Sequence, residues 1–153
     1  ILPIANLYKY QIREIGRKLG LSAEVYNREP FPGPGLYLRI VDCVVTKEKL
    51  DLIREADYIV RSIIKKHNLN QHISQLVVAL LGCFVVGVRG DERSYDMPIS
   101  IRAVVSNDFM TAEPFYFDKE IINEVTSSLT QLPHVSRILF DMTPKPPATT
   151  EYQ

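Results

Sequence analysis

Hydrophobic residues recur at helical spacing in three stretches of the chain. The first stretch follows Asn6, which can cap a helix, and ends at Gly20, and a short second helix is expected over 22–27. The second follows the potential cap Thr46 and has the apolar positions Leu50, Ile53, Ala56, Val60, Ile63 and Ile64. The third follows Asp118, with Ile121, Ile122, Val125 and Leu129 at the same spacing. The pattern predicts a helical N-terminus and two longer amphipathic helices.

Four other stretches are rich in Leu, Ile and Val, and they predict strands over 36–45, 76–88, 95–106 and 134–143. The second reads as one bent strand or two, and it pairs with the third through a Gly90-Asp91 turn whose loop is longer than the tightest hairpins. The order β-α-β-β-α-β predicts an α+β fold of two layers, with the helices on one face of a mainly antiparallel sheet. Because the strands look apolar on both faces, a partner subunit or neighbouring domain is expected to cover the other face.

A stiff turn separates the N-terminal helices from the rest of the chain. The run Pro30-Phe-Pro-Gly-Pro-Gly35 forbids regular structure and offers hinge-like glycines. We therefore place a domain boundary here, with residues 1–29 as the end of some other domain and residues 30–153 as a domain of their own. Because the chain begins at Ile1 without a methionine, it is expected to be part of a longer polypeptide.

The charge balance argues against whole classes of function. The 153 residues carry 18 Lys and Arg against 18 Asp and Glu, so no basic surface attracts nucleic acid or a membrane. The longest apolar run, 76–88, is too short to span a bilayer, and no secretory signal is present. Cys43 and Cys83 lie in apolar runs and read as buried thiols. A cytoplasmic location is the expectation.

No self-sufficient active site is visible in the sequence. The chain has neither a glycine-rich phosphate loop opening a helix nor a metal-ligand pattern. The histidines His67, His72 and His134 stand beside linkers, without an acid or nucleophile at a suggestive spacing. We therefore expect no catalytic residue and no metal ligand within this chain.

The segment Lys145-Pro-Pro-Ala-Thr-Thr-Glu151 is the strongest candidate for a binding site. Adjacent prolines remove two backbone donors, and polyproline geometry would hold the flanking side chains at set positions. Those side chains are the cation Lys145, the hydroxyls of Thr149 and Thr150 and the carboxylate Glu151, and Arg137 begins the preceding strand. Cations and hydroxyls suit a phosphate, and a carboxylate suits a ribose diol or a base N–H. The alternative is a solvated, proline-rich tail.

Two further residues remain open to more than one interpretation. Gln75 stands at the start of an apolar strand, where it could bond a base edge or simply end the linker. Asp91 follows Gly90 and could hold a sugar hydroxyl or a cation, although a charged hairpin tip is the ordinary interpretation.

Several motifs together resemble one family. They are Asn6-Leu-Tyr-Lys-Tyr-Gln-Ile-Arg-Glu-Ile-Gly-Arg-Lys-Leu-Gly-Leu21, Arg28-Glu-Pro-Phe-Pro-Gly-Pro-Gly-Leu36, Val86-Gly-Val-Arg-Gly-Asp-Glu-Arg-Ser-Tyr95, Ser106-Asn-Asp-Phe-Met-Thr111 and Lys145-Pro-Pro-Ala-Thr-Thr-Glu151. In this order they resemble the C-terminal part of GMP synthetase, from about Leu2 to the end of the chain.

The resemblance implies an enzyme that converts XMP to GMP with ATP, Mg and ammonia released from glutamine. Residues 1–29 would end an α/β ATP-pyrophosphatase domain, and residues 30–153 would dimerise the enzyme and bind XMP. Lys145 and Arg137 would contact the phosphate with help from Thr149 and Thr150. The remaining implied XMP contacts are Glu151, Gln75 and Asp91. A glutamine amidotransferase domain or subunit would supply the ammonia.

The chain departs from the family at three places. It lacks the pyrophosphatase loop Ser-Gly-Gly-x-Asp-Ser and the Cys-His-Glu glutaminase set, so ATP and glutamine would be handled elsewhere in the enzyme. The family often ends Glu-Trp-Glu, whereas this chain ends Glu151-Tyr152-Gln153, which puts a role for the last residue in doubt. The rival function is a non-catalytic dimerisation module that has lost nucleotide binding.

Overall fold

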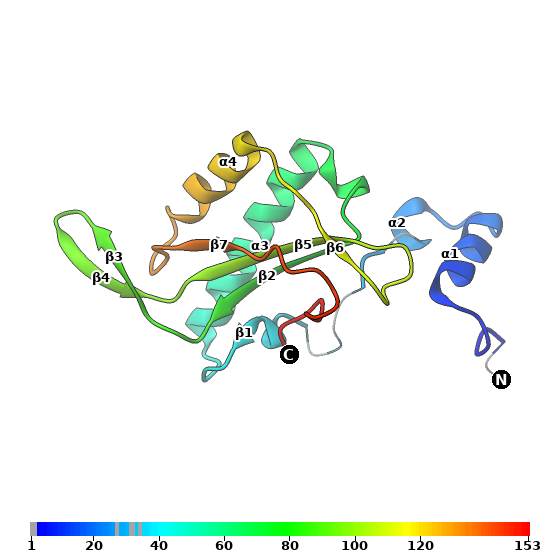
Figure 1. The fold of residues 1–153 in the computed structure, drawn as a ribbon, viewed down its shortest axis with the longest axis horizontal. Coiled ribbons are helices and arrows are strands. Elements are labelled where there is room, and N and C mark those ends of the chain that lie inside the picture. The colour runs from blue at the N-terminus through cyan, green and yellow to red at the C-terminus, as the bar shows by residue number, and fades with distance from the viewer. Residues whose placement is uncertain (1–2, 27, 31–32, 34) are drawn as a thin grey trace.

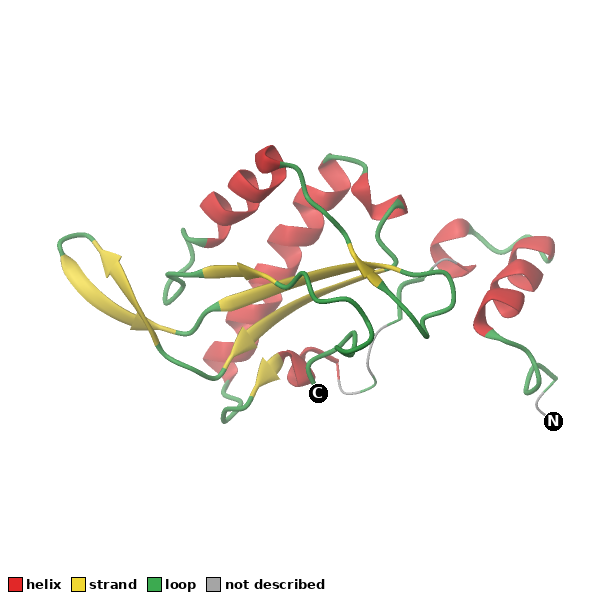
Figure 2. Ribbon diagram, in the orientation of Figure 1, coloured by secondary structure: helices red, strands yellow, loops and turns green. Residues whose placement is uncertain are grey.

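The computed structural model describes residues 3–26, 28–30, 33 and 35–153. It is an α+β structure in which a run of consecutive strands lies between two amphipathic helices (Figure 1, Figure 2). In order, the elements are α1 (Lys9–Lys18), α2 (Ala23–Tyr26), the 3-10 helix η1 (Gly35–Arg39), β1 (Ile40–Val41), α3 (Lys47–Lys66), the 3-10 helix η2 (Leu69–Gln71), β2 (Gln75–Leu81), β3 (Val85–Arg89), β4 (Glu92–Asp96), β5 (Ile99–Val105), β6 (Glu113–Pro114), α4 (Lys119–Leu129) and β7 (Ile138–Phe140).

The main sheet is mixed rather than mainly antiparallel. Strands β2 and β5 pair antiparallel at its centre, and β6 also pairs antiparallel with β5. Strand β1 pairs with β2 and β7 with β5 in parallel. The parallel pairs arise because a helix, α3 or α4, returns the chain to the same end of the sheet before the next strand begins. Strands β3 and β4 form a separate two-stranded sheet that projects from the body (Figure 1).

One face of the sheet packs against α3 and α4 to form the core (Figure 1). Thr46 caps α3 by accepting a hydrogen bond from the amide of Lys49, and the apolar stripe of α3 is buried at Ile53, Ala56 and Val60. Alternate residues of β2 and β5 complete this core: Leu76, Val78, Leu80, Ile99, Ile101 and Ala103. Burial of a fully enclosed Ile or Leu contributes about 1.5–3 kcal/mol, so this layer dominates the stability of the domain.

The chain itself covers the centre of the opposite face. The C-terminal segment, residues 143–153, crosses strands β2 and β5 on the side away from the helices. The hydroxyl of Tyr152 lies 2.7 Å from that of Ser100, and Arg102 donates a 2.6 Å hydrogen bond to the carbonyl of Thr143. Both faces of the central strands are therefore buried, as their apolar sequence indicated, but much of the cover is intramolecular.

The predicted strand over 36–45 is largely wrong. The structure has the 3-10 helix η1 and only two residues of strand β1 there. The reason is Arg39, whose side chain is fully buried and donates hydrogen bonds to Asp57, Glu151 and the carbonyl of Leu76. A tight helical turn brings the guanidinium to α3 and to the start of β2, which a straight strand of alternating residues would not do.

The other strands form with different lengths than expected. Residues 76–88 make two strands, one of the two options, and residues 95–106 also split at Pro98. The loop between β3 and β4 is only Gly90 and Asp91, so the expected longer loop is wrong. Gly90 has φ +63, which allows this tight turn. The last strand is shorter than 134–143, and β6 was not predicted because two residues carry too little pattern.

The N-terminal helices differ in detail from the prediction. Helix α1 begins at Lys9 with Tyr8 as its cap, not Asn6, because the side chain of Gln11 reaches back to the amide of Tyr8 at 2.9 Å. Gly20 follows the helix in the left-handed conformation, as a stop requires. The predicted end of the second helix at 27, and residues 31, 32 and 34 of the proline turn, lie outside the described residues.

Neither cysteine is buried as expected. Cys83 is exposed and Cys43 is half-buried, because strands β1 and β2 end at Val41 and Leu81, just before them. Between those strand ends, Gly82 lies against the backbone of the neighbouring loop. A Cβ atom on Gly82 would lie 2.4 Å from the carbonyl oxygen of Asp42.

We expect Gly82→Ala to lower the free energy of unfolding by about 1–3 kcal/mol, because rigid backbone cannot move away from the added methyl group. Urea denaturation monitored by circular dichroism measures the change in the free energy of unfolding. Gly33→Ala is the matched control, since a Cβ atom there meets no atom of the described residues within 4 Å. Equal stability of the two variants would contradict the close approach at Gly82.

Candidate functional site

The C-terminal segment turns at its prolines instead of running extended. The amide and carbonyl of Lys145 both bond to Ala112, at 2.8 and 2.9 Å, and form an isolated antiparallel bridge. After the bridge, the amide of Ala148 donates to the carbonyl of Pro144 and closes a turn. The expected polyproline geometry is therefore wrong.

The side chain of Lys145 is half-buried, and its ammonium is held at one point. Nζ donates a 2.7 Å hydrogen bond to the carbonyl oxygen of Phe109. An ammonium has three N–H donors, and no second acceptor contacts this one among the described residues. The remaining donors can therefore bind an anion without losing the contact that orients the group.

Glu151 connects the C-terminal segment to the edge of the sheet. Its Oε1 accepts hydrogen bonds from Nε2 of Gln75 at 2.9 Å and from Nη2 of Arg39 at 3.3 Å. Its Oε2 is buried and has no hydrogen-bond partner among the described residues. A buried carboxylate oxygen without a partner costs free energy, so it favours a ligand that brings an N–H or O–H donor.

A second polar cluster lies beneath the same segment. Arg102, only 1% exposed, is 3.2 Å from Oδ2 of Asp141, which also accepts from the hydroxyl of Tyr152 at 3.0 Å. Burial raises the pKa of Asp141, but hydrogen bonds from Thr143 and Tyr152 and the charge of Arg102 outweigh it and leave that pKa below its usual value. Burial, followed by the nearby carboxylate, raises the pKa of Tyr152 to about 12. The cluster anchors the chain end against β5.

The two threonines play lesser parts. The hydroxyl of Thr149 donates to the carbonyl of Glu151 within the segment, which shapes the turn. Thr150 is half-buried, and its side chain has no hydrogen bond to another described residue.

Arg137 and Asp91 do not join this cluster. Arg137 is exposed and donates a 3.5 Å hydrogen bond to the carbonyl of Val86, at the base of the β3–β4 hairpin. Asp91 is exposed in the turn at the hairpin tip. Among the described residues, neither is hydrogen-bonded or ion-paired to the C-terminal segment. The structure thus brings Gln75 to Glu151 by a hydrogen bond, while Lys145 contacts the loop at Phe109 and Ala112 and shares only the segment with Glu151. Arg137 and Asp91 lie elsewhere.

Sequence reasoning missed Arg39 and Arg102, two buried cations that donate hydrogen bonds to the C-terminal segment at Glu151 and Thr143. A signal did exist, because Arg102 interrupts the apolar run Ile99–Val105 and a charge in such a run needs a buried partner. Two histidines also have an acid partner that the sequence did not suggest: His67 lies 2.7 Å from the carboxylate of Glu124 on α4, and His134 lies 3.9 Å from that of Asp96.

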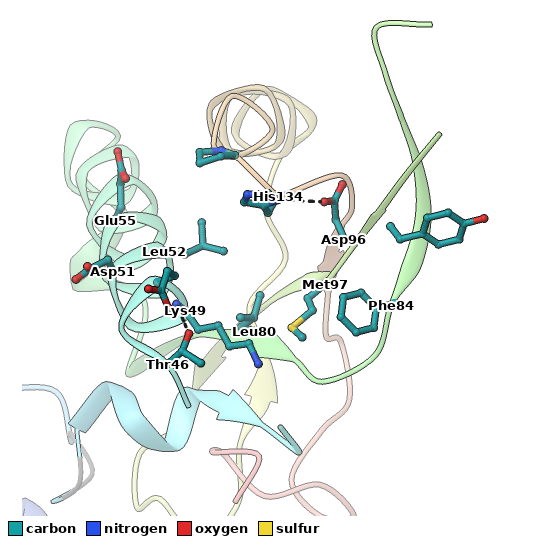
Figure 3. A pocket seen from close by; sticks show the side chains of 13 residues that line it. Thr46, Lys49, Asp51, Leu52, Glu55, Leu80, Phe84, Asp96, Met97 and His134 are labelled. Atoms are coloured by element: carbon teal, nitrogen blue, oxygen red, sulfur yellow. Dashed lines mark hydrogen bonds and ion pairs between the residues drawn. The ribbon is translucent and has the colours of Figure 1, made fainter. Parts of the chain in front are cut away.

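Two cavities are large enough to be considered as ligand sites. One of about 480 Å³ lies between α3 and the hairpin base and includes none of the predicted site residues (Figure 3). Its carboxylates Asp51, Glu55 and Asp96 would repel a phosphate. The other, of about 550 Å³, is lined by residues 37, 40 and 42–45 and by Gln153 at the chain end. Ligand sites for small molecules are commonly about 300–1,000 Å³, but this cavity, like the first, includes none of the predicted site residues.

A family model described as the GMP synthase C terminal domain matches residues 62–152. The chain belongs to this family. GMP synthase [glutamine-hydrolyzing] from Acetivibrio thermocellus is 42% identical over 154 residues, and those from Lacticaseibacillus rhamnosus and Natranaerobius thermophilus are each 44% identical. Each alignment covers 100% of this chain but 30% of the relative, so the chain corresponds to the C-terminal part of a GMP synthase.

Two general features accompany this family assignment. Among the described residues, no helix is long and apolar enough to cross a membrane. Within the same residues, no group of three or more His, Cys, Asp or Glu side chains could hold a metal ion.

Proposed function

We propose that this chain binds XMP and dimerises an enzyme that aminates XMP to GMP. The observation that carries the proposal is the buried Oε2 of Glu151, which has no hydrogen-bond partner among the described residues. It lies on the same short segment as the ammonium of Lys145, which uses one of its three donors within the described residues. One end of the segment offers a cation and the other an acceptor, which are the two groups that a nucleoside monophosphate needs. Membership of the GMP synthase C-terminal family supports XMP as the nucleotide.

The roles of the individual residues follow from their positions. Lys145 would bind the phosphate, with the hydroxyls of Thr149 and Thr150 beside it. Glu151 would accept from the base or ribose through Oε2, while Gln75 holds its other oxygen. Arg137 and Asp91 remain proposed XMP contacts through the family resemblance alone.

The rest of the reaction would be performed by other parts of the enzyme. Residues 1–29 are proposed to be the end of the ATP-pyrophosphatase domain, which would bind ATP with Mg and activate XMP. A glutamine amidotransferase domain or subunit would deliver ammonia. Exposed apolar residues on the β3–β4 hairpin, such as Val88 and Tyr95, are consistent with a homodimer contact.

Calorimetric titration of the complete enzyme with XMP tests this proposal, with AMP and IMP as controls. XMP carries an oxygen at C2 that IMP lacks. Loss of one hydrogen bond to a charged group costs about 1.5–3 kcal/mol, so we expect IMP to bind roughly tenfold or more weakly.

The outcome separates the two candidate functions. If the protein is folded and dimeric but binds none of the three nucleotides, the chain is a non-catalytic dimerisation module. Equal affinity for XMP, IMP and AMP would support the phosphate site but contradict recognition of the base.

A further inference from the structure

Lys145 is held by a single loop, residues 106–112, through both its backbone and its side chain. Ala112 at the end of the loop makes the two backbone hydrogen bonds, and Phe109 at its centre accepts the bond from Nζ. Because the carbonyl of Phe109 is the described acceptor of this ammonium, the position of Phe109 sets the position of the charge.

The loop is tightly organised by its own polar groups. Oγ of Ser106 accepts from the amide of Phe109 at 2.8 Å, and the carboxylate of Asp108 accepts from the amides of Met110 and Thr111. These amide hydrogen bonds lower the pKa of Asp108. Ser106 is in turn joined to Ser74, next to β2, by reciprocal hydrogen bonds of 2.9 Å. The loop is therefore fixed to the sheet at one end and to Lys145 at the other.

Phe109 itself has an unfavourable backbone conformation. Its φ is +62, in the left-handed region that a bulky side chain rarely adopts. Such strain persists only where the surroundings compensate for it, and it is commonly found at functional sites. Here it turns the carbonyl of Phe109 toward Lys145.

The ring of Phe109 contacts two cations from the N-terminal helix α1. Nζ of Lys9 lies 5.6 Å from the ring centroid, and the guanidinium carbon of Arg13 lies 5.2 Å from it. Arg13 also donates a 2.9 Å hydrogen bond to the carbonyl of Arg28. Helix α1 therefore reaches the loop through Phe109, although it lies to one side of the sheet (Figure 1).

We propose that Phe109 is a positioning residue, which holds Lys145 for the nucleotide phosphate and transmits the position of helix α1 to that lysine through its contacts with Lys9 and Arg13. The inference rests on the proposed XMP function. It assigns the N-terminal segment a part in nucleotide affinity without direct contact between α1 and the C-terminal segment. The affinity for XMP thereby becomes sensitive to whatever moves α1.

The test measures XMP affinity of the complete enzyme by calorimetry for Phe109→Gly, Phe109→Tyr and the double variant Lys9→Ala, Arg13→Ala. Glycine adopts the left-handed conformation freely, so Phe109→Gly removes the ring and leaves the backbone path allowed. Exposed cation–π contacts are individually weak, and we expect affinity to fall about threefold to tenfold in Phe109→Gly and in the double variant. Phe109→Tyr retains the ring and should bind like the wild type. Tyr116→Gly, which removes an exposed aromatic, is the matched control and should bind normally.

A double-mutant cycle distinguishes positioning from general structural damage. If Phe109 acts through Lys145, Phe109→Gly has no further effect on XMP affinity in a Lys145→Ala background. Additive losses would overturn the inference, as would normal affinity in both Phe109→Gly and the double variant. Unchanged affinity in Lys145→Ala alone would instead overturn the phosphate role and the inference with it. If Phe109→Gly fails to fold, the variant that combines Lys9→Ala with Arg13→Ala decides whether the inference holds, because it leaves Phe109 in place.

Discussion

Replacement of Asp141 by alanine is expected to lower the free energy of unfolding by about 3–5 kcal/mol, because it leaves the charge of Arg102 buried without its partner. Arg102 is 1% exposed, and its Nε and Nη2 have no hydrogen-bond partner among the described residues. The substitution also removes the acceptor of the Tyr152 hydroxyl and so loosens the chain end. Urea denaturation of Asp141→Ala against the wild type measures the loss.

Two comparisons make this stability prediction specific. Asp51→Ala, which removes an exposed carboxylate paired with Lys47 and Arg54, should change stability by less than about 1 kcal/mol. Replacing the buried pair together, as Arg102→Met with Asp141→Leu, should recover much of the loss, since no buried charge then remains. A double variant as unstable as Asp141→Ala would mean that packing, not charge, determines the effect.

The contribution of Asp141 to the free energy of unfolding is expected to decrease as the pH falls. Because the pKa of Asp141 is lowered in the folded protein, its contribution is complete above the unfolded pKa of about 4 and is lost as pH falls through the folded value. The difference in stability between the wild type and Asp141→Ala should therefore narrow below about pH 4.

Local signals in the sequence predicted the helices well. Thr46 and Asp118 precede α3 and α4 as expected, and periodic apolar residues follow each of them. These features act within one or two helical turns, so they can be recognised without knowledge of the tertiary structure. The cap of α1 failed because a side chain three residues ahead, Gln11, bonds the amide of Tyr8 and starts the helix later than Asn6 predicts.

The errors in the strands have long-range causes. Arg39 shapes η1 through partners that are 18, 37 and 112 residues away in the sequence. No pattern within residues 36–45 contains those partners. Similarly, the cover of the sheet by the C-terminal segment depends on Ser100 and Tyr152, which are 52 residues apart.

The same contrast between local and long-range signals applies to the candidate site, whose residues remain a prediction. Lys145, Thr149, Thr150 and Glu151 lie in one short motif, so their proximity follows from the sequence. The hydrogen bond between Gln75 and Glu151 spans 76 residues and was not predicted, because the family resemblance implied only that each of them contacts XMP. The role of Phe109 was not foreseen, because a backbone carbonyl leaves no trace in the residue type.

Removal of the Lys145 side chain is expected to weaken XMP binding by the complete enzyme roughly tenfold to a hundredfold, while the fold is retained. One hydrogen bond between an ammonium and a phosphate contributes about 1.5–3 kcal/mol, and each 1.4 kcal/mol corresponds to a tenfold change in affinity. The fold should persist because the two backbone bonds between Lys145 and Ala112 do not depend on the side chain. Calorimetric titration of Lys145→Ala with XMP measures the affinity, and thermal denaturation checks the fold.

Lys49→Ala is the matched control for this experiment. Like Lys145, Lys49 donates to a backbone carbonyl, that of Val44 at 2.8 Å, but it lies at the start of α3 and lines the cavity of Figure 3. The control should bind XMP as the wild type does, and Lys145→Arg should retain part of the affinity because it keeps the charge. Unchanged XMP affinity in a folded Lys145→Ala enzyme would exclude this lysine from the phosphate site. Oε2 of Glu151, which has no partner among the described residues, would then be expected to bind a ligand other than a nucleotide whose phosphate contacts Lys145.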